Sequence, residues 1–146
     1  MQRRTFLRAV AVAALAWPRA ARAQQPAHMP VVGYLGFATP ETFAAQLDDF
    51  RRGLAAHGFV EGRNIRIEYR WADGDRAKLP ALAEELVRMP VDVITTSGGY
   101  LPPLTAAGIT DRIPIVASSA ADLVENLARP QRNLTGAGTQ TGPLEP

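Results

Sequence analysis

The sequence contains no cysteine, which excludes disulfide bonds and thiolate metal sites. Only two histidines occur, His28 and His57, and neither forms an H-E-x-x-H or Ser-His-Asp pattern with its neighbours. We therefore expect no metal site, no catalytic residues and no cofactor. With 146 residues, the chain is long enough to fold as one domain around its own core.

Long apolar runs are also absent. The run Ala9–Trp17 has nine residues, less than half of what a membrane-spanning helix needs. Basic Arg3 and Arg4 precede it, and an A-R-A sequence follows it. This order is typical of a secretory signal, so we expect residues 1–23 to be a signal peptide that is cleaved after Ala23. The mature protein is then expected in the periplasm.

The pair Arg3 and Arg4 resembles the twin-arginine export signal. Gln2 stands where that signal usually has Ser or Thr, and Arg8 stands where it usually has Lys. The alanine-rich apolar core fits the twin-arginine route. An ordinary secretory leader with a chance arginine pair is the alternative.

After removal of the leader the chain is mildly acidic and has no run of basic residues. Five of the 16 basic residues lie in the leader, which leaves 11 against 14 acidic residues and a formal net charge of −3. Proteins that bind nucleic acid present a basic surface, so nucleic acid is excluded as a partner.

The rest of the chain alternates between short apolar runs and amphipathic segments. Ile65, Ile67 and Tyr69 alternate with charged residues, which predicts a half-exposed strand at a sheet edge. Apolar runs predict further strands at 31–37, 91–96, 113–118 and the start of 133–138. Apolar residues at helical spacing predict helices in 41–58, 77–89, 101–112, where the helix is short, and 120–128.

The first helix has recognisable end signals. Thr39 is expected to cap it, Pro40 suits its first turn, and Gly58 suits a left-handed residue at its end.

This order of elements predicts an α/β fold, a three-layer Rossmann-like parallel sheet with helices on both faces. In such sheets, ligands bind beyond the carboxyl ends of the strands. We therefore expect functional residues where each strand stops, in 36–39, 71–74, 97–100 and 118–122.

Ser97, Gly98 and Gly99 follow a strand and open a helix. Their backbone N–H groups and the helix N-terminus can converge on a carboxylate or another anion. The alternative is a plain turn in which glycine relieves strain. The segment lacks the G-x-G-x-x-G and G-x-x-x-x-G-K-[ST] patterns, so nucleotide binding is not supported.

Two other groups of residues at strand ends have two interpretations each. Ser118, Ser119 and Asp122 can bind an ammonium or hydroxyl group of a ligand, or Ser119 can cap the next helix with Asp122 completing a capping box. Trp71 can stack on a ligand or fill space beside the next helix. Tyr100, like Phe37, is placed to form the wall of a pocket for an apolar or aromatic ligand.

Several longer segments together resemble a known family. The chain is similar to ABC transporter substrate-binding proteins of the tryptophan/tyrosine-type group, which have the type I periplasmic-binding fold. The segments that carry this resemblance are PVVGYLGFATPE (30–41), FRRGLAAHGFVEGRNIRIEYRWADGDRAKLPALAEELV (50–87), VDVITTSGG (91–99), RIPIVASSAADLVENLARP (112–130) and NLTGAGT (133–139).

The resemblance implies a layout and a set of ligand contacts. Family members close two α/β lobes on a small ligand. The implied layout here is a mature N-terminal tail at 24–30, a single N-terminal lobe at 31–140, and a stub at 141–146 where a second lobe would begin, so the chain is expected to be truncated. The ligand-binding residues that the resemblance implies are Phe37, Ala38, Thr39, Ser97, Gly98, Gly99, Ser118, Ser119 and Asp122.

The expected function is that of a periplasmic solute-binding component of an ABC import system, without catalysis. Its expected partners are a small polar or amino-acid-like solute and the ABC permease in the inner membrane. Surface left uncovered by the incomplete lobe also predicts self-association. The alternatives are a truncated remnant that binds nothing, and a periplasmic flavodoxin-like enzyme, which requires a phosphate loop or a buried acid/base pair.

Overall fold

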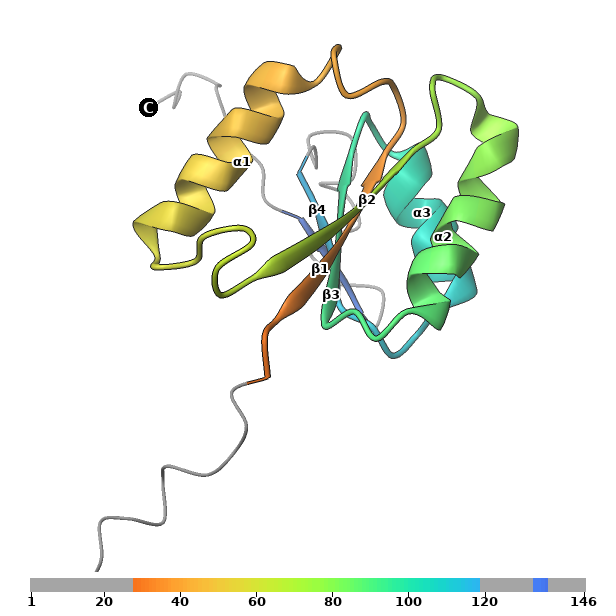
Figure 1. Ribbon diagram of the computed structural model, residues 1–146. Helices are drawn as coiled ribbons and strands as arrows, with labels where there is room; N and C mark the ends of the chain where they lie inside the picture. The colour runs from red at the N-terminus through yellow and green to blue at the C-terminus, as the bar shows by residue number, and fades with distance from the viewer. Residues whose placement is uncertain (1–27, 119–132, 137–146) are drawn as a thin grey trace, which may run out of the picture.

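The computed structural model describes residues 28–118 and 133–136. These residues form a five-stranded, entirely parallel sheet with helices on both faces (Figure 1). The α/β fold predicted from the sequence is confirmed. In chain order the elements are β1 (Val31–Gly36), α1 (Ala44–Ala56), β2 (Arg66–Trp71), the 3-10 helix η2 (Arg76–Lys78), α2 (Leu79–Arg88), β3 (Val93–Ser97), α3 (Leu101–Ile109), β4 (Ile115–Ala117) and β5 (Leu134–Gly136).

The strand order in the sheet is β2-β1-β3-β4-β5. The chain leaves β1 toward β2 on one side and leaves β3 toward β4 on the other. The direction of strand progression therefore reverses between the neighbouring strands β1 and β3. In open α/β sheets, ligands bind beyond the carboxyl ends of the strands at such a point. Here these ends are Gly36 and Ser97.

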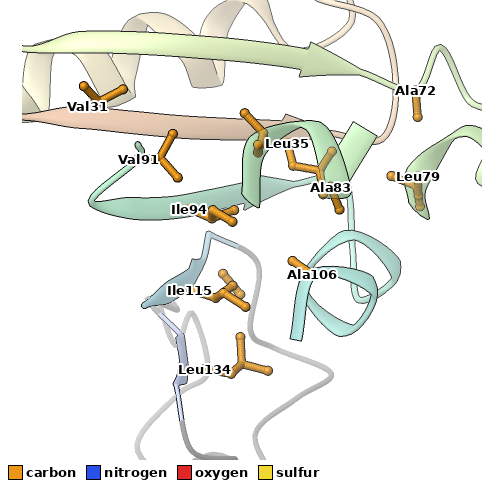
Figure 2. Close-up of a cluster of buried hydrophobic side chains, with 12 residues drawn as sticks. Val31, Leu35, Ala72, Leu79, Ala83, Val91, Ile94, Ala106, Ile115 and Leu134 are labelled. Atoms are coloured by element: carbon orange, nitrogen blue, oxygen red, sulfur yellow. The ribbon is translucent and has the colours of Figure 1, made fainter. Parts of the chain in front are cut away.

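The larger part of the core lies between the sheet and helices α2 and α3. Leu35, Leu79, Leu86 and Ile94 are fully buried there, and Figure 2 shows side chains of this cluster reaching from the strands toward the helices. The strand VVGYLG is apolar throughout because all six of its residues are buried.

Helix α1 covers the other face of the sheet at β1 and β2. Leu47 of α1 packs there with Val32, Tyr34 and Ile67. The Tyr34 ring also contacts three other aromatic rings, with centroids 5.6 Å away for Phe50, 5.6 Å for Tyr69 and 5.2 Å for Trp71.

The strand with alternating charges, β2, lies at the edge of the sheet, as predicted. Ile67 is buried while Arg66 is exposed. Arg70 is half-buried and donates a hydrogen bond to Glu85 of α2 at 2.7 Å, so one of the charged residues of this strand serves to hold the helix.

The start of the first helix differs from the prediction. Residues 40–43 form a turn, and α1 begins only at Ala44. Thr39 caps this turn rather than the helix, because its Oγ1 accepts the Thr42 N–H at 3.4 Å. The helix end is as predicted: Gly58 has a φ of +86° and donates to the Ala55 carbonyl.

The other differences are small. Strand β3 occupies 93–97 and β4 only 115–117, and α3 is short, as predicted from its prolines. The signal peptide and the predicted helix at 120–128 lie outside the described residues. Within 28–118 and 133–136, no helix has the length and apolar character needed to cross a membrane.

Candidate ligand-binding site

The loops after β1, β2 and β3 are joined by backbone hydrogen bonds at the carboxyl end of the sheet. The Phe37 N–H donates to the Ser97 carbonyl at 3.1 Å, and the Gly74 N–H donates to the Phe37 carbonyl at 2.8 Å. The loop after β1 is thus fixed between its two neighbours.

The two glycines after β3 have a clear structural reason. Gly98 and Gly99 have φ values of +92° and +90°, a region that side chains other than hydrogen rarely allow. A Cβ on Gly98 would lie 2.6 Å from the Cβ of Phe37, whereas one on Gly99 would meet nothing within 4 Å. The strain-relief interpretation of this turn therefore holds for both glycines through their φ values, and for Gly98 also through its contact with Phe37.

The backbone N–H groups of these two glycines are candidate donors to a ligand. Among residues 28–118 and 133–136, the N–H groups of Gly98 and Gly99 donate to no backbone carbonyl. The following helix adds less than the sequence suggested, because Pro102 and Pro103 in its first turn have no N–H and both are buried. An anion at this position would be held by the loop more than by the end of α3.

Ser97 carries a buried hydroxyl without a partner. The residue is 3% exposed, and its Oγ makes no hydrogen bond to any residue within 28–118 and 133–136. A buried hydroxyl that lacks a partner costs about 1–3 kcal/mol, so such groups in a folded protein call for an explanation. The register pairs Ser97 with Gly36 of β1, which places the hydroxyl beside the point where strand progression reverses.

A second unpaired hydroxyl belongs to the preceding residue. Thr96 is 1% exposed, and in the described part of the chain its Oγ1 also lacks a partner. Successive residues of a strand point to opposite faces, so Thr96 lies on the α2 and α3 face and Ser97 on the α1 face. Only the Ser97 hydroxyl therefore shares a face with Trp71, through the row Trp71, Gly36 and Ser97.

Ser118 is close to this row, but its hydroxyl is engaged. Its Oγ donates to the Thr96 carbonyl at 2.6 Å, and its N–H donates to the same oxygen at 3.1 Å. These bonds tie the end of β4 to β3. Ser119 and Asp122, the other predicted contacts in this loop, lie outside the described residues.

The aromatic residues of the predicted site point in different directions. Trp71 packs on Gly36, where a Cβ would lie 2.2 Å from its ring, and on Tyr34. Of its two interpretations, the packing role is the one with contacts in the structure. Phe37 is half-buried against the α2 and α3 core, while Tyr100 is 52% exposed.

The two remaining predicted contacts, Ala38 and Thr39, are half-buried in the loop after β1. Thr39 makes its contact within the loop, where its Oγ1 lies 3.1 Å from the Thr42 hydroxyl.

Sequence reasoning missed a charged pair at this end of the sheet. Asp73 has a φ of +54°, the one positive value for a non-glycine residue in the described ranges, and its carboxylate lies 3.1 Å from Lys78 Nζ. The Asp75 N–H donates to the Ala72 carbonyl at 2.9 Å, which closes the turn. The Asp-Gly dipeptide at 73–74 indicates the turn from sequence, but no local signal indicates that Asp73 pairs with Lys78.

A hollow elsewhere on the molecule is distinct from this site. It has a volume of about 320 Å³ and lies at the end of α1 and the turn that follows, lined by Arg51, Arg52, Leu54, Ala55, Phe59, Val60 and Glu61. Arg51 is already paired there, because it donates to Glu61 at 2.9 Å and to the Tyr69 hydroxyl at 3.1 Å.

Within the described part of the chain, no cluster of three His, Asp or Glu residues has the geometry of a metal site.

Comparison with known proteins identifies the family. Residues 36–144 match the family model described as ABC transporter substrate binding protein. The chain belongs to this family. The family consists of substrate-binding proteins and is not a family of enzymes. No curated protein matches the chain in sequence.

Solved structures with the same fold come from chains that are longer than this one. A conserved domain protein from Vibrio cholerae O1 biovar El Tor is 26% identical, with a TM-score of 0.65 over 74% of this chain. An ABC domain from Streptococcus pneumonia in complex with L-Trp is 22% identical, with a TM-score of 0.63 over 74%. The open, ligand-free substrate-binding protein CD0873 from Clostridium difficile is 24% identical, with a TM-score of 0.63 over 73%. The chain spans 38% of the length of each of these structures.

Proposed function

We propose that the described lobe forms one side of a binding site for a small polar or amino-acid-like solute. The unpartnered, buried hydroxyl of Ser97 carries the proposal. A ligand atom at this position would complete its hydrogen bonding and would remove the cost of leaving it unpaired. The N–H groups of Gly98 and Gly99, which donate to no backbone carbonyl within 28–118 and 133–136, lie next in the chain and offer two further donors.

These groups favour a ligand with a carboxylate or carbonyl oxygen. A hydroxyl and two backbone N–H groups all donate hydrogen bonds, and the two glycines have no side chain that would keep a ligand from their backbone. An amino acid supplies such an oxygen in its carboxylate. A related fold from Streptococcus pneumonia is described in complex with L-Trp, which supports an amino acid as the solute.

The wider role that we propose is delivery of this solute to an ABC permease in the inner membrane. Membership in the family supports this role. The signal peptide predicted at 1–23, with Arg3 and Arg4 as its export signal, would bring the protein to the periplasm. Ser118, Ser119 and Asp122 would line the site after β4, and a second lobe would supply its other side.

A thermal-shift screen of the chain against the twenty amino acids and a set of sugars tests this proposal. We expect at least one amino acid to raise the melting temperature. Ser97→Ala should weaken binding at least about tenfold, because a hydrogen bond to a charged group contributes about 1.5 kcal/mol or more. Without ligand, the same variant should be as stable as the wild type or more so, because it removes an unpaired buried group.

Thr135→Ala is the matched control, because Thr135 is an exposed strand hydroxyl on β5. It should bind as the wild type does. If no amino acid binds, or if Ser97→Ala binds as tightly as Thr135→Ala, the proposed site is wrong. Tight binding of a flavin or nucleotide instead would support the enzyme alternative.

A further inference from the structure

The Ser97 hydroxyl is closed off from solvent although it lies at the end of its strand. Its Oγ is buried, and the whole residue is 3% exposed. The next residues along the chain are more open, because Gly98 and Gly99 are half-buried and Tyr100 is exposed. A solute can therefore reach the Ser97 hydroxyl only after a covering side chain has moved.

The Trp71 ring lies over the strand next to Ser97. Trp71 on β2 and Ser97 on β3 flank Gly36 of β1 in the register, and all three share the α1 face of the sheet. Two ring atoms of Trp71, Cε3 and Cζ3, lie 2.2 Å from the position that a Cβ of Gly36 would have. The ring has therefore crossed from β2 to β1, and it lies one strand spacing, about 4.8 Å, from the strand that carries Ser97.

The space over Gly36 exists because this residue has no side chain. Any larger residue at position 36 would occupy the place that the Trp71 ring fills. The space borders Ser97 on the β3 side and lies at the end of the sheet where ligands of such folds bind. When the ring is elsewhere, this space is wide enough for a planar group and lies beside the Ser97 hydroxyl.

The position of Trp71 in the sheet allows its ring to turn away. Trp71 is the last residue of β2, and within 28–118 and 133–136 no strand lies on the outer side of β2. The residue is half-buried, and its ring packs on Tyr34 with centroids 5.2 Å apart. A ring at the end of an edge strand can turn outward without moving the backbone of the sheet.

We infer that Trp71 is a gate over the Ser97 hydroxyl. Its ring fills the space over Gly36 in the ligand-free protein, and a solute enters this space only when the ring has turned outward. The inference rests on the proposed function for the binding role of Ser97. The open form is the minor one, so the apparent dissociation constant of a solute is the intrinsic constant divided by the open fraction. Trp71 thus lowers the affinity of the site, whereas a ring that stacks on the solute would raise it.

The rate at which a thiol at position 97 reacts with N-ethylmaleimide tests the gate without any solute. The chain has no cysteine, so Ser97→Cys introduces a single thiol, which is small enough for a buried site. Labelling should be slow in Ser97→Cys and at least about tenfold faster when Trp71→Ala is added, because the open form then rises from a minor fraction, about 10% or less, to nearly all. Trp71→Phe has a shorter ring and should give an intermediate rate. It also keeps an aromatic residue on β2, which serves if the alanine variant folds poorly.

Two thiols elsewhere are the matched controls. Thr135→Cys lies at an exposed position of β5 and gives the rate of an open site. Thr96→Cys lies at a buried position on the opposite face of β3 and reports a general loosening of the lobe. Trp71→Ala should change neither rate.

Three labelling results would overturn the inference. The first is labelling of Ser97→Cys that is equally slow with and without Trp71, which would mean that another segment, such as residues 119–132, covers position 97. The second is labelling of Ser97→Cys as fast as that of Thr135→Cys while Trp71 is present. The third is an equal acceleration at Thr96→Cys, which would show that Trp71→Ala loosens the whole lobe.

The labelling experiment and the thermal-shift screen can fail separately. If no solute binds but Trp71→Ala exposes position 97, the proposed function is wrong and the covering of Ser97 by Trp71 stands. If an amino acid binds, Trp71→Ala should lower its dissociation constant. A dissociation constant that rises instead would overturn the gate and would show that the Trp71 ring stacks on the solute.

Discussion

The position of a Cβ on Gly98 lies 2.6 Å from the Cβ of Phe37, closer than two such carbon atoms pack in proteins. Phe37 cannot move away easily, because its N–H is bonded to Ser97 and its carbonyl to Gly74. The loops after β1 and β3 therefore touch through a glycine at the candidate site.

Gly98→Ala should lower the free energy of unfolding by about 2 kcal/mol or more, from the positive φ and the clash with Phe37 together. Gly99→Ala has a similar φ but open space and should cost about 1 kcal/mol. Urea unfolding measures both. Equal losses for the two variants would show that the contact with Phe37 is not tight.

Gly36→Ala should displace the Trp71 ring, because the added carbon would lie 2.2 Å from it. We expect a loss of about 1–3 kcal/mol and a red shift of the Trp71 fluorescence. A Trp17→Phe background removes the other tryptophan. Gly53→Ala is the control, since its Cβ position is open and α1 gains helix propensity there. Unchanged emission in Gly36→Ala would contradict the packing of Trp71 on β1.

The Asp92 carboxyl group should make the free energy of unfolding decrease at acid pH. The Val31 N–H, and secondarily His28, lower the pKa of its carboxyl group. The Asp92 carboxylate therefore makes its full contribution to the free energy of unfolding above the ordinary pKa of an aspartate. This contribution is lost as the pH falls through the lowered pKa that Asp92 has in the folded protein. Asp92→Asn should flatten this part of the acid unfolding curve, and His28→Gln should change it less. A larger effect of His28→Gln would show that the backbone contact is the minor one.

Tyr69 should stay neutral to high pH. Burial raises the pKa of its hydroxyl to about 12, the bond from Arg51 opposes the shift, and Glu61 adds to it. Because the folded pKa is raised, the stabilisation is present below the ordinary tyrosine pKa and is lost as the pH rises through about 12. Ultraviolet titration of the wild type and of Tyr69→Phe measures this step. If the two curves differ near pH 10, where exposed tyrosines ionise, the burial of Tyr69 has been overstated.

The sequence predicted those features of the fold that depend on local pattern. The unbroken apolar run VVGYLG indicated a strand buried on both faces, and the alternation of Ile65 and Ile67 with charges indicated an edge strand. Gly58 indicated the end of α1 because a left-handed residue is needed there.

Features that depend on contacts between distant segments could not be predicted. The unpaired hydroxyl of Ser97 becomes evident only once the burial and neighbours of β3 are known. The start of α1 at Ala44 depends on the hydrogen bonds between Thr39 and Thr42, which stabilise the turn before the helix. The contact of Gly98 with Phe37 joins residues about sixty positions apart.

The most direct test of the central claim is a nuclear magnetic resonance titration of the ¹⁵N-glycine-labelled chain with the amino acid that binds in the thermal screen. The account predicts that the amide signals of Gly98 and Gly99 shift with saturation. Those of Gly53 and Gly62, which are sequence neighbours of residues that line the hollow at the end of α1, should stay in place. Shifts at Gly53 and Gly62, with Gly98 and Gly99 unchanged, would contradict a solute site at the carboxyl end of the sheet.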